Sequence, residues 1–101
     1  MAHVTTFQFT ALPGKRQAVI DTFKEWEAQE RGGAAGFQAS TIASSNSNPD
    51  QFVAVVRWDT TENYNKNSER PSTNAWFQKL RTNLAADPVW FDGTVVAETS
   101  A

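Results

Sequence analysis

Apolar and polar residues alternate at the start of the chain. Over residues 3–11, Phe7, Phe9 and Ala11 fall on one side of an extended backbone and polar residues fall on the other. The pattern predicts a half-buried first strand. The Leu-Pro-Gly sequence at residues 12–14 favours a turn after it, because proline fixes its own φ angle and glycine tolerates unusual ones.

In the next segment the spacing of apolar residues changes from every second residue to the spacing of a helix. Over residues 15–31 the apolar side chains recur at helical spacing, and charged residues fill the positions between them. The apolar residues are Val19, Ile20, Phe23 and Trp26. We expect an amphipathic helix that ends at Gly32 and Gly33 through the left-handed conformation that glycine readily adopts.

Two strand-like segments, residues 36–44 and 51–58, flank a run of turn-forming residues at 45–50, which predicts an antiparallel hairpin. In the first of them, simple alternation places Phe37, Ala39, Thr41 and Ala43 on one face and Gln38, Ser40, Ile42 and Ser44 on the other. In the second, Phe52, Ala54, Val56 and Trp58 share one face and Val53 and Val55 the other. Because both of its faces are apolar, we expect residues 51–58 to form a central strand.

A second helical region begins at residues 60–62, is interrupted around residues 68–71 and resumes near Ser72. Its apolar stripe consists of Trp76, Phe77, Leu80 and Leu84. The Asp-Pro pair at residues 87 and 88 is expected to stop this helix, and residues 89–98 to form a last strand.

The order β-α-β-β-α-β predicts an α+β fold of the ferredoxin-like type, as a single domain over residues 1–101. Right-handed crossovers place both helices on one face of a four-stranded antiparallel sheet. Nothing within the chain covers the opposite face, although residues 51–58 present apolar side chains to it. We therefore expect a homodimer that forms through this sheet face.

Composition and charge narrow the range of partners. Lys and Arg total 9 and are scattered, and Asp and Glu total 11, so neither nucleic acid nor an anionic membrane is an expected partner. The absence of cysteine excludes disulfides and thiolate chemistry, and no metal-ligating spacing occurs. The first ten residues lack a secretory pattern and no stretch has the apolar length of a membrane span, so we expect a cytoplasmic protein.

Several short motifs, taken in order, resemble one family. They are Pro-Gly-Lys at residues 13–15, Gly-Phe at 36–37, Asn-Pro-Asp-Gln-Phe-Val at 48–53 and Arg-Trp-Asp at 57–59. Over about residues 4–96 the chain resembles the antibiotic biosynthesis monooxygenase family. The resemblance implies a dimeric α/β barrel with a small-molecule pocket between the sheet and the helices of each protomer. The best-known activity of the family is the oxidation of polycyclic aromatic phenols to quinones by dioxygen, with no metal, flavin or other cofactor.

The resemblance also implies a site. In the family's oxygenases a tryptophan that ends the third strand and a tyrosine six residues later line the pocket, and Trp58 and Tyr64 occupy these places. Trp58 would stack on the substrate and Tyr64 would donate a hydrogen bond to it. Two pocket asparagines of the family are replaced, one by Ala54 and the other by Phe7. The haem-degrading branch needs a histidine on the second helix, whereas the only histidine here is His3, which we expect to be solvated near the N-terminus.

Each of these assignments has an alternative based on packing. Trp58 could be a core residue whose indole N–H meets a backbone acceptor, and Tyr64 could be merely packed or exposed. The expected substrate-contacting residues are Phe7, Phe23, Ala54, Trp76 and Phe77, whose positions also suit an ordinary core. We therefore expect a cofactor-independent monooxygenase that acts on an aromatic, quinol-type molecule. A non-catalytic dimer that binds an apolar molecule, or a cofactor-free isomerase or cyclase of the same fold, remains an alternative.

Overall fold

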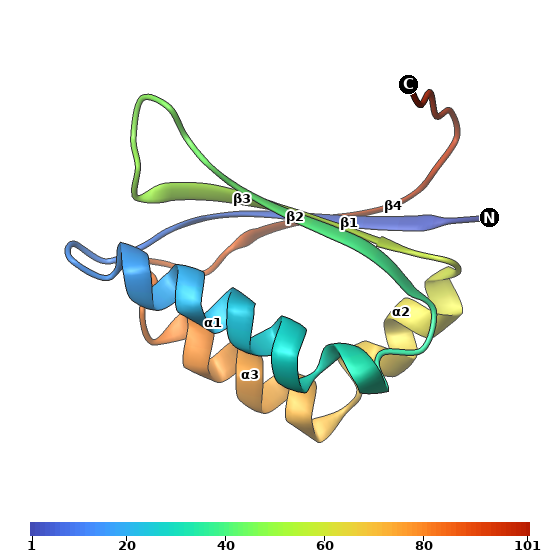
Figure 1. Cartoon of the computed structure of the whole chain (residues 1–101), viewed down its shortest axis with the longest axis horizontal. Helices are drawn as coiled ribbons and strands as arrows, with labels where there is room; N and C mark the ends of the chain where they lie inside the picture. The colour runs from blue at the N-terminus through green and yellow to red at the C-terminus, as the bar shows by residue number, and fades with distance from the viewer.

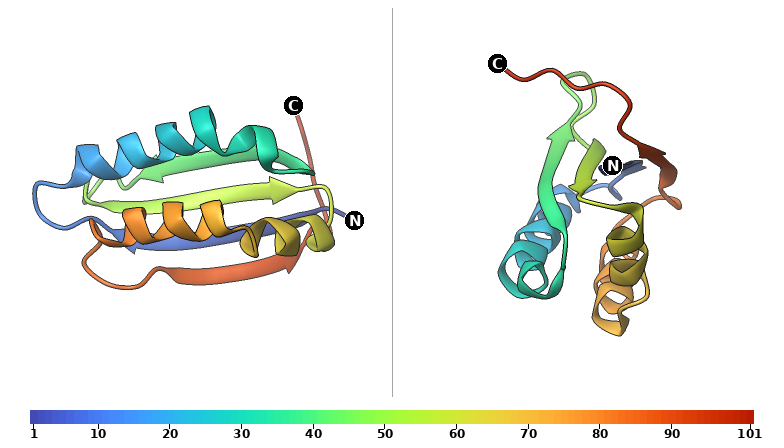
Figure 2. Two further views of the ribbon diagram at one scale, coloured as in Figure 1. Left: turned by 90° about the horizontal axis from the view of Figure 1, so that it is seen from below. Right: turned by 90° about the vertical axis from the view of Figure 1, so that its right-hand side faces the viewer.

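The computed structural model describes residues 1–101, and its four strands form one antiparallel sheet in the order β2-β3-β1-β4 (Figure 1). The elements are β1 (His3–Thr10), α1 (Arg16–Gln29), a 3₁₀ turn η1 (Arg31–Gly33), β2 (Phe37–Ser44), β3 (Gln51–Trp58), α2 (Thr61–Ser68), α3 (Pro71–Arg81) and β4 (Val89–Thr94). All helices lie on one face of the sheet, which we call the inner face (Figure 2). The ferredoxin-like fold expected from the sequence is thus confirmed.

Apolar side chains of β1 and β3 form the core under the helices. The two strands pair so that Phe9 lies opposite Phe52, with their ring centroids 5.4 Å apart. Val19 of α1 and Leu80 of α3 are fully buried against this layer. The apolar side chains that alternation in the sequence placed together therefore lie on the inner face of both central strands.

The end of α1 differs from the prediction. The helix ends at Gln29, and Gly32 and Gly33 belong to η1 with no left-handed φ angle. Gly36 is the residue that needs such an angle, at φ 83°, and a Cβ there would clash with Oδ1 of Asp59. Its carbonyl oxygen accepts a hydrogen bond of 2.8 Å from the backbone N–H of Asp59. Close packing of two chain segments thus requires glycine at this position.

A β-bulge near the start of β2 corrects the expected facing of that strand. Phe37 pairs with Trp58 but Ala39 already pairs with Arg57, so one residue of β2 has no counterpart in β3. Phe37 consequently leaves the face of Ala39 and joins the inner face, where its ring centroid lies 4.9 Å from that of Trp26. Simple alternation failed because an inserted residue reverses the facing of every side chain on one side of it.

The predicted interruption of the second helical region is confirmed. The side chain of Thr60 caps α2 by accepting a hydrogen bond of 3.1 Å from the backbone N–H of Asn63, and Pro71 begins α3. However, α3 ends at Arg81 rather than before residues 87 and 88. The chain instead turns so that Leu84, still buried, pairs with Ala11 beyond the end of β1.

The outer face of the sheet carries exposed apolar side chains. Val55 is 41% exposed, Phe91 65% and Val89 72%, and the C-terminal tail lies on this side (Figure 1). The last strand ends at Thr94, opposite the first residue of β1, and not at residue 98 as expected. Beyond it, the backbone N–H of Val95 donates one more hydrogen bond of 2.9 Å to the carbonyl oxygen of Ala2. Arg57 of β3 meets the tail through an ion pair of 2.7 Å with Glu98. No helix has the length and apolarity that crossing a bilayer requires.

Candidate functional site

A cavity of about 860 Å³ lies between the inner face of the sheet and the helices. This volume falls within the range of roughly 300–1,000 Å³ that is typical of small-molecule sites. Aromatic rings form much of its wall, among them those of Phe7, Phe23, Phe37, Trp76, Phe77 and Trp90. Such walls favour a flat apolar ligand, because offset stacking and edge contacts to rings add to the burial of apolar area.

Most of the residues expected to contact a substrate line this cavity. Phe7, Phe23, Trp76 and Phe77 do so, but Ala54 does not. Ala54 is fully buried in the core, with Phe7 opposite it on β1 and Ile42 opposite it on β2. The methyl group is too short to reach past these larger neighbours, so the position contributes to packing and offers no contact to the cavity.

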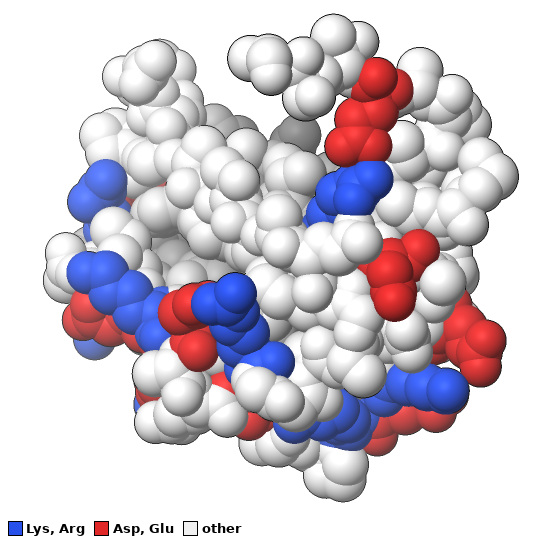
Figure 3. All heavy atoms as spheres, turned by 45° about the vertical axis from the view of Figure 1, so that its right-hand side comes forward, with Lys and Arg blue, Asp and Glu red and all other residues white.

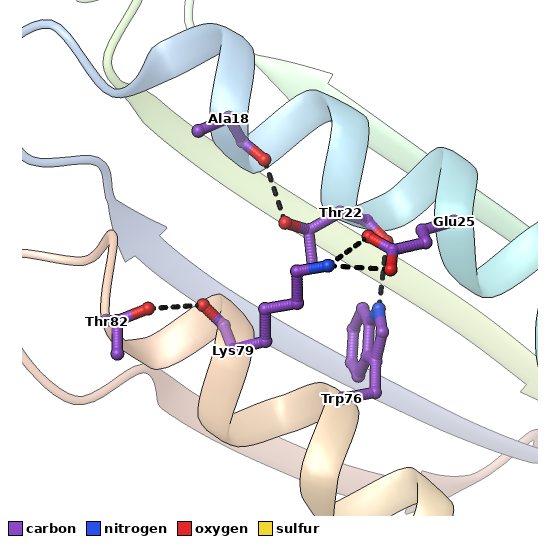
Figure 4. A network of polar contacts seen from close by, with 6 residues as sticks. All are labelled: Ala18, Thr22, Glu25, Trp76, Lys79 and Thr82. Carbon is purple, nitrogen blue, oxygen red and sulfur yellow. Dashed lines mark hydrogen bonds and ion pairs between the residues drawn. The ribbon is translucent and has the colours of Figure 1, made fainter.

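The two tryptophans Trp58 and Trp76 use their indole N–H groups differently. Nε1 of Trp76 donates a hydrogen bond of 2.8 Å to the carbonyl oxygen of Thr22, which ties α3 to α1 (Figure 4). Trp58 is 2% exposed and lines the cavity, yet its Nε1 is buried without any acceptor. The backbone acceptor that the packing alternative gives to Trp58 is therefore absent. An unpaired buried donor costs about 1–3 kcal/mol, which a bound acceptor could recover.

Tyr64 lies on α2 at the edge of the same cavity. Its ring meets that of Trp58 edge-on at 6.1 Å, and it stacks on His3 at 4.3 Å between centroids. Burial raises the pKa of Tyr64 above its ordinary value of 10.0, the Thr5 hydroxyl lowers it and the charge of Asp92 raises it. The phenol group of Tyr64 is therefore a neutral donor near neutral pH.

His3 is buried, contrary to the expectation of a solvated N-terminal histidine. It is 2% exposed because Thr5, Thr61 and Tyr64 surround its ring. Nε2 lies 2.7 Å from Oγ1 of Thr5, and Nδ1 lies 3.0 Å from Oγ1 of Thr61. No sequence pattern indicates this cluster, because Thr61 and Tyr64 lie on α2, far from His3 in the chain.

Asn67 is a cavity residue that sequence reasoning missed. It is 8% exposed, lies one helical turn after Tyr64 and lines the cavity. Its Oδ1 accepts a hydrogen bond of 3.1 Å from the guanidinium of Arg70, which fixes the amide so that Nδ2 faces away from this contact. No hydrogen bond from Nδ2 to another residue forms, so this donor remains for a ligand. Its spacing of three residues from Tyr64 on a helix was the available signal.

Charged side chains on the helical layer are mixed in sign (Figure 3). Arg31 pairs with Glu27 at 2.6 Å, and Lys79 pairs with Glu25 at 2.7 Å across α3 and α1 (Figure 4). No group of three or more histidine, cysteine or acidic side chains is arranged to hold a metal ion.

Comparisons with known proteins agree with this architecture. A family model described as antibiotic biosynthesis monooxygenase matches residues 2–79. A candidate antibiotic biosynthesis monooxygenase from Chloroflexus aurantiacus is 20% identical, with a TM-score of 0.80 over 99% of this chain and 98% of its own. A variant of SnoaB, a cofactor-independent oxygenase from Streptomyces nogalater, is 15% identical, with a TM-score of 0.76 over 96% of this chain and 95% of its own. Likenesses at these identities show a shared fold. No curated protein matches the sequence.

Proposed function

The chain belongs to the antibiotic biosynthesis monooxygenase family, and from this premise we propose that it is a monooxygenase that oxidises an aromatic, quinol-type molecule with dioxygen and without a cofactor. One observation carries the proposal. A single aromatic-walled cavity brings together the unpaired indole N–H of Trp58 and the hydroxyl group of Tyr64. Two hydrogen-bond donors among apolar rings suit a flat ligand that bears an oxygen acceptor.

The proposed reaction balances without an external reductant. A phenol with a free para position reacts with one dioxygen to give a quinone and one water molecule. One oxygen atom becomes the new carbonyl, and the other leaves as water with the phenolic hydrogen and the para hydrogen. The substrate thus supplies all four electrons that reduce dioxygen.

The residues would contribute mainly by orientation and exclusion of water. Phe7, Phe23 and Trp76 would hold the ring plane, and Trp58 and Tyr64 would donate hydrogen bonds to the substrate oxygen. These bonds strengthen as negative charge develops on that oxygen when the phenol gives up its proton. Nδ2 of Asn67 would provide a third donor from α2, at a different place from either replaced asparagine.

The proposal includes a homodimer formed through the outer face of the sheet. Val55, Val89 and Phe91 expose apolar area there, and burying it stabilises association by about 25 cal/mol per Å². A cytoplasmic location is also part of the proposal, and fractionation of the host cells tests it.

Incubation of the purified protein with 1-naphthol and related phenols, with and without dioxygen, tests the function. We expect quinone to form only with dioxygen, and more slowly in Trp58→Phe and Tyr64→Phe. Tight binding without any product would instead support the non-catalytic alternative. Product formed equally without dioxygen would support isomerisation or cyclisation.

A further inference from the structure

A polar cluster closes one end of the otherwise apolar inner face. His3 and Thr5 on β1, Asp92 on β4 and Thr61 on α2 contact one another there. Oγ1 of Thr5 donates a hydrogen bond of 2.6 Å to Oδ1 of Asp92. His3 and Thr5 are each 2% exposed, so the cluster needs complete hydrogen bonding to be stable.

The directions of these hydrogen bonds follow from the groups present. An ionised Asp92 can only accept, so the single hydroxyl proton of Thr5 points to it. The oxygen of Thr5 must then accept from Nε2–H of His3, 2.7 Å away. Nδ1 of the neutral imidazole is left to accept from the hydroxyl of Thr61 at 3.0 Å. One tautomer of His3 therefore satisfies the whole cluster.

The cluster connects the cavity to solvent. Thr5 and Tyr64 line the cavity, and His3 stacks on Tyr64 with 16° between the ring planes. At the other end, the side chain of Asp92 is 50% exposed. Asp92 and Tyr64 are the titratable groups that face His3 from the neighbouring elements.

We propose that Thr5 and Asp92 form a proton relay that removes the phenolic proton of a ligand from the cavity, with His3 as the residue that positions Thr5. The inference rests on the proposed function and extends it. In the step, the ligand O–H bond breaks and its proton goes to Oγ1 of Thr5, while the former proton of Thr5 goes to Oδ1 of Asp92. The ligand becomes a phenolate and Asp92 a neutral acid, which returns the proton to water.

The test uses 2-naphthol, a phenol whose excited state is strongly acidic and whose phenolate fluoresces at a different wavelength. It reports proton transfer from the bound ligand under anaerobic conditions, without any oxidation. We expect naphtholate emission from the complex with the unmodified protein. The emission should be lost in Asp92→Asn and Thr5→Val and restored in Thr5→Ser, which keeps a hydroxyl group.

Turnover and nuclear magnetic resonance give independent readouts. In Asp92→Asn, oxidation of a phenol should fall about 100-fold at neutral pH and recover as pH rises towards the pKa of the free phenol, with little change in KM. Because His3 is the only histidine, its ¹⁵N signals should report the Nε2–H tautomer directly. If the naphtholate emission and the pH profile of turnover stay unchanged in Asp92→Asn, the relay is refuted but the proposed function is not. Failure to bind 2-naphthol would overturn the proposed function together with it.

Discussion

Replacing Trp58 by phenylalanine should separate ligand recognition from stability. The unpaired N–H of this buried residue costs the free protein about 1–3 kcal/mol, and phenylalanine removes that cost. The smaller ring also gives up buried apolar area, at a cost of about 1 kcal/mol. These terms oppose each other, so the free energy of unfolding should stay unchanged or rise by at most about 2 kcal/mol.

Binding should respond differently. A ligand oxygen that accepts from Nε1 of Trp58 recovers the cost of the unpaired donor, about 2 kcal/mol, so Trp58→Phe should weaken binding of such a ligand about 30-fold. A hydrocarbon of the same shape gains nothing from that donor. The affinity of the protein for the hydrocarbon should change only because the substitution alters the shape of the cavity wall.

Trp76→Phe is the matched control, because it makes the same exchange in the same cavity wall. Its N–H is already bonded to the carbonyl oxygen of Thr22, so the substitution removes a hydrogen bond that the free protein makes. We expect the free energy of unfolding to fall by about 2 kcal/mol, with equal effects on ligands with and without an oxygen.

Isothermal titration calorimetry with 1,4-naphthoquinone and naphthalene measures both affinities, and urea unfolding measures both stabilities. The ratio of the two affinities cancels the change of shape. If Trp58→Phe weakens both ligands by the same factor, its indole N–H plays no part in recognition and the reasoning from the unpaired donor is wrong.

Three further outcomes are expected. Gly36→Ala should lower the free energy of unfolding by about 1–3 kcal/mol in urea, since alanine is strained at φ 83°, whereas Gly32→Ala, with open space around its Cβ, should have little effect; equal effects would contradict the packing argument. An absorbance titration of Tyr64, the only tyrosine, should have its midpoint above pH 10.0, and a midpoint at or below 10.0 would contradict the burial argument. Because the folded state holds the phenolic proton more tightly than the unfolded state, the stability linked to this proton is present below pH 10.0 and is lost as pH rises through the higher folded pKa. Phe91→Lys should convert a dimer to monomers in analytical ultracentrifugation, and a monomeric unmodified protein would refute the proposed interface.

The sequence predicted β3 with its observed bounds, Gln51–Trp58. Alternation there is uninterrupted, and turn formers on one side and the capping residue Thr60 on the other leave no alternative register. The bulge in β2 could not be predicted, because Gln38 differs in no local property from an ordinary strand residue. Gln38 is left out of the pairing between β2 and β3 because of how Phe37 packs against Trp26 and Trp58.

The lining of the candidate site was predictable where a family position or an apolar stripe of a helix marked it. Trp58 and Tyr64 lie at the cavity as expected, whereas the burial of His3 depends on contacts with Thr61 and Asp92, which are distant in the chain. A histidine beside the N-terminus looks solvated when only its neighbours in sequence are considered. Such long-range polar contacts leave no periodic pattern, so sequence reasoning could not find the cluster.

Because side chains along β3 alternate between the two faces of the sheet, substitutions in this strand fall into two groups. Side chains at even-numbered positions from Phe52 to Trp58 face the helices, and those of Val53, Val55 and Arg57 face the opposite way. If the proposed ligand site and dimer are correct, substitutions on the first set tune ligand choice and substitutions on the second tune self-association, each without disturbing the other. A single inserted residue within this strand would exchange the two sets at once, so deletion and insertion scanning should find β3 far less permissive than β2, which already accommodates an extra residue.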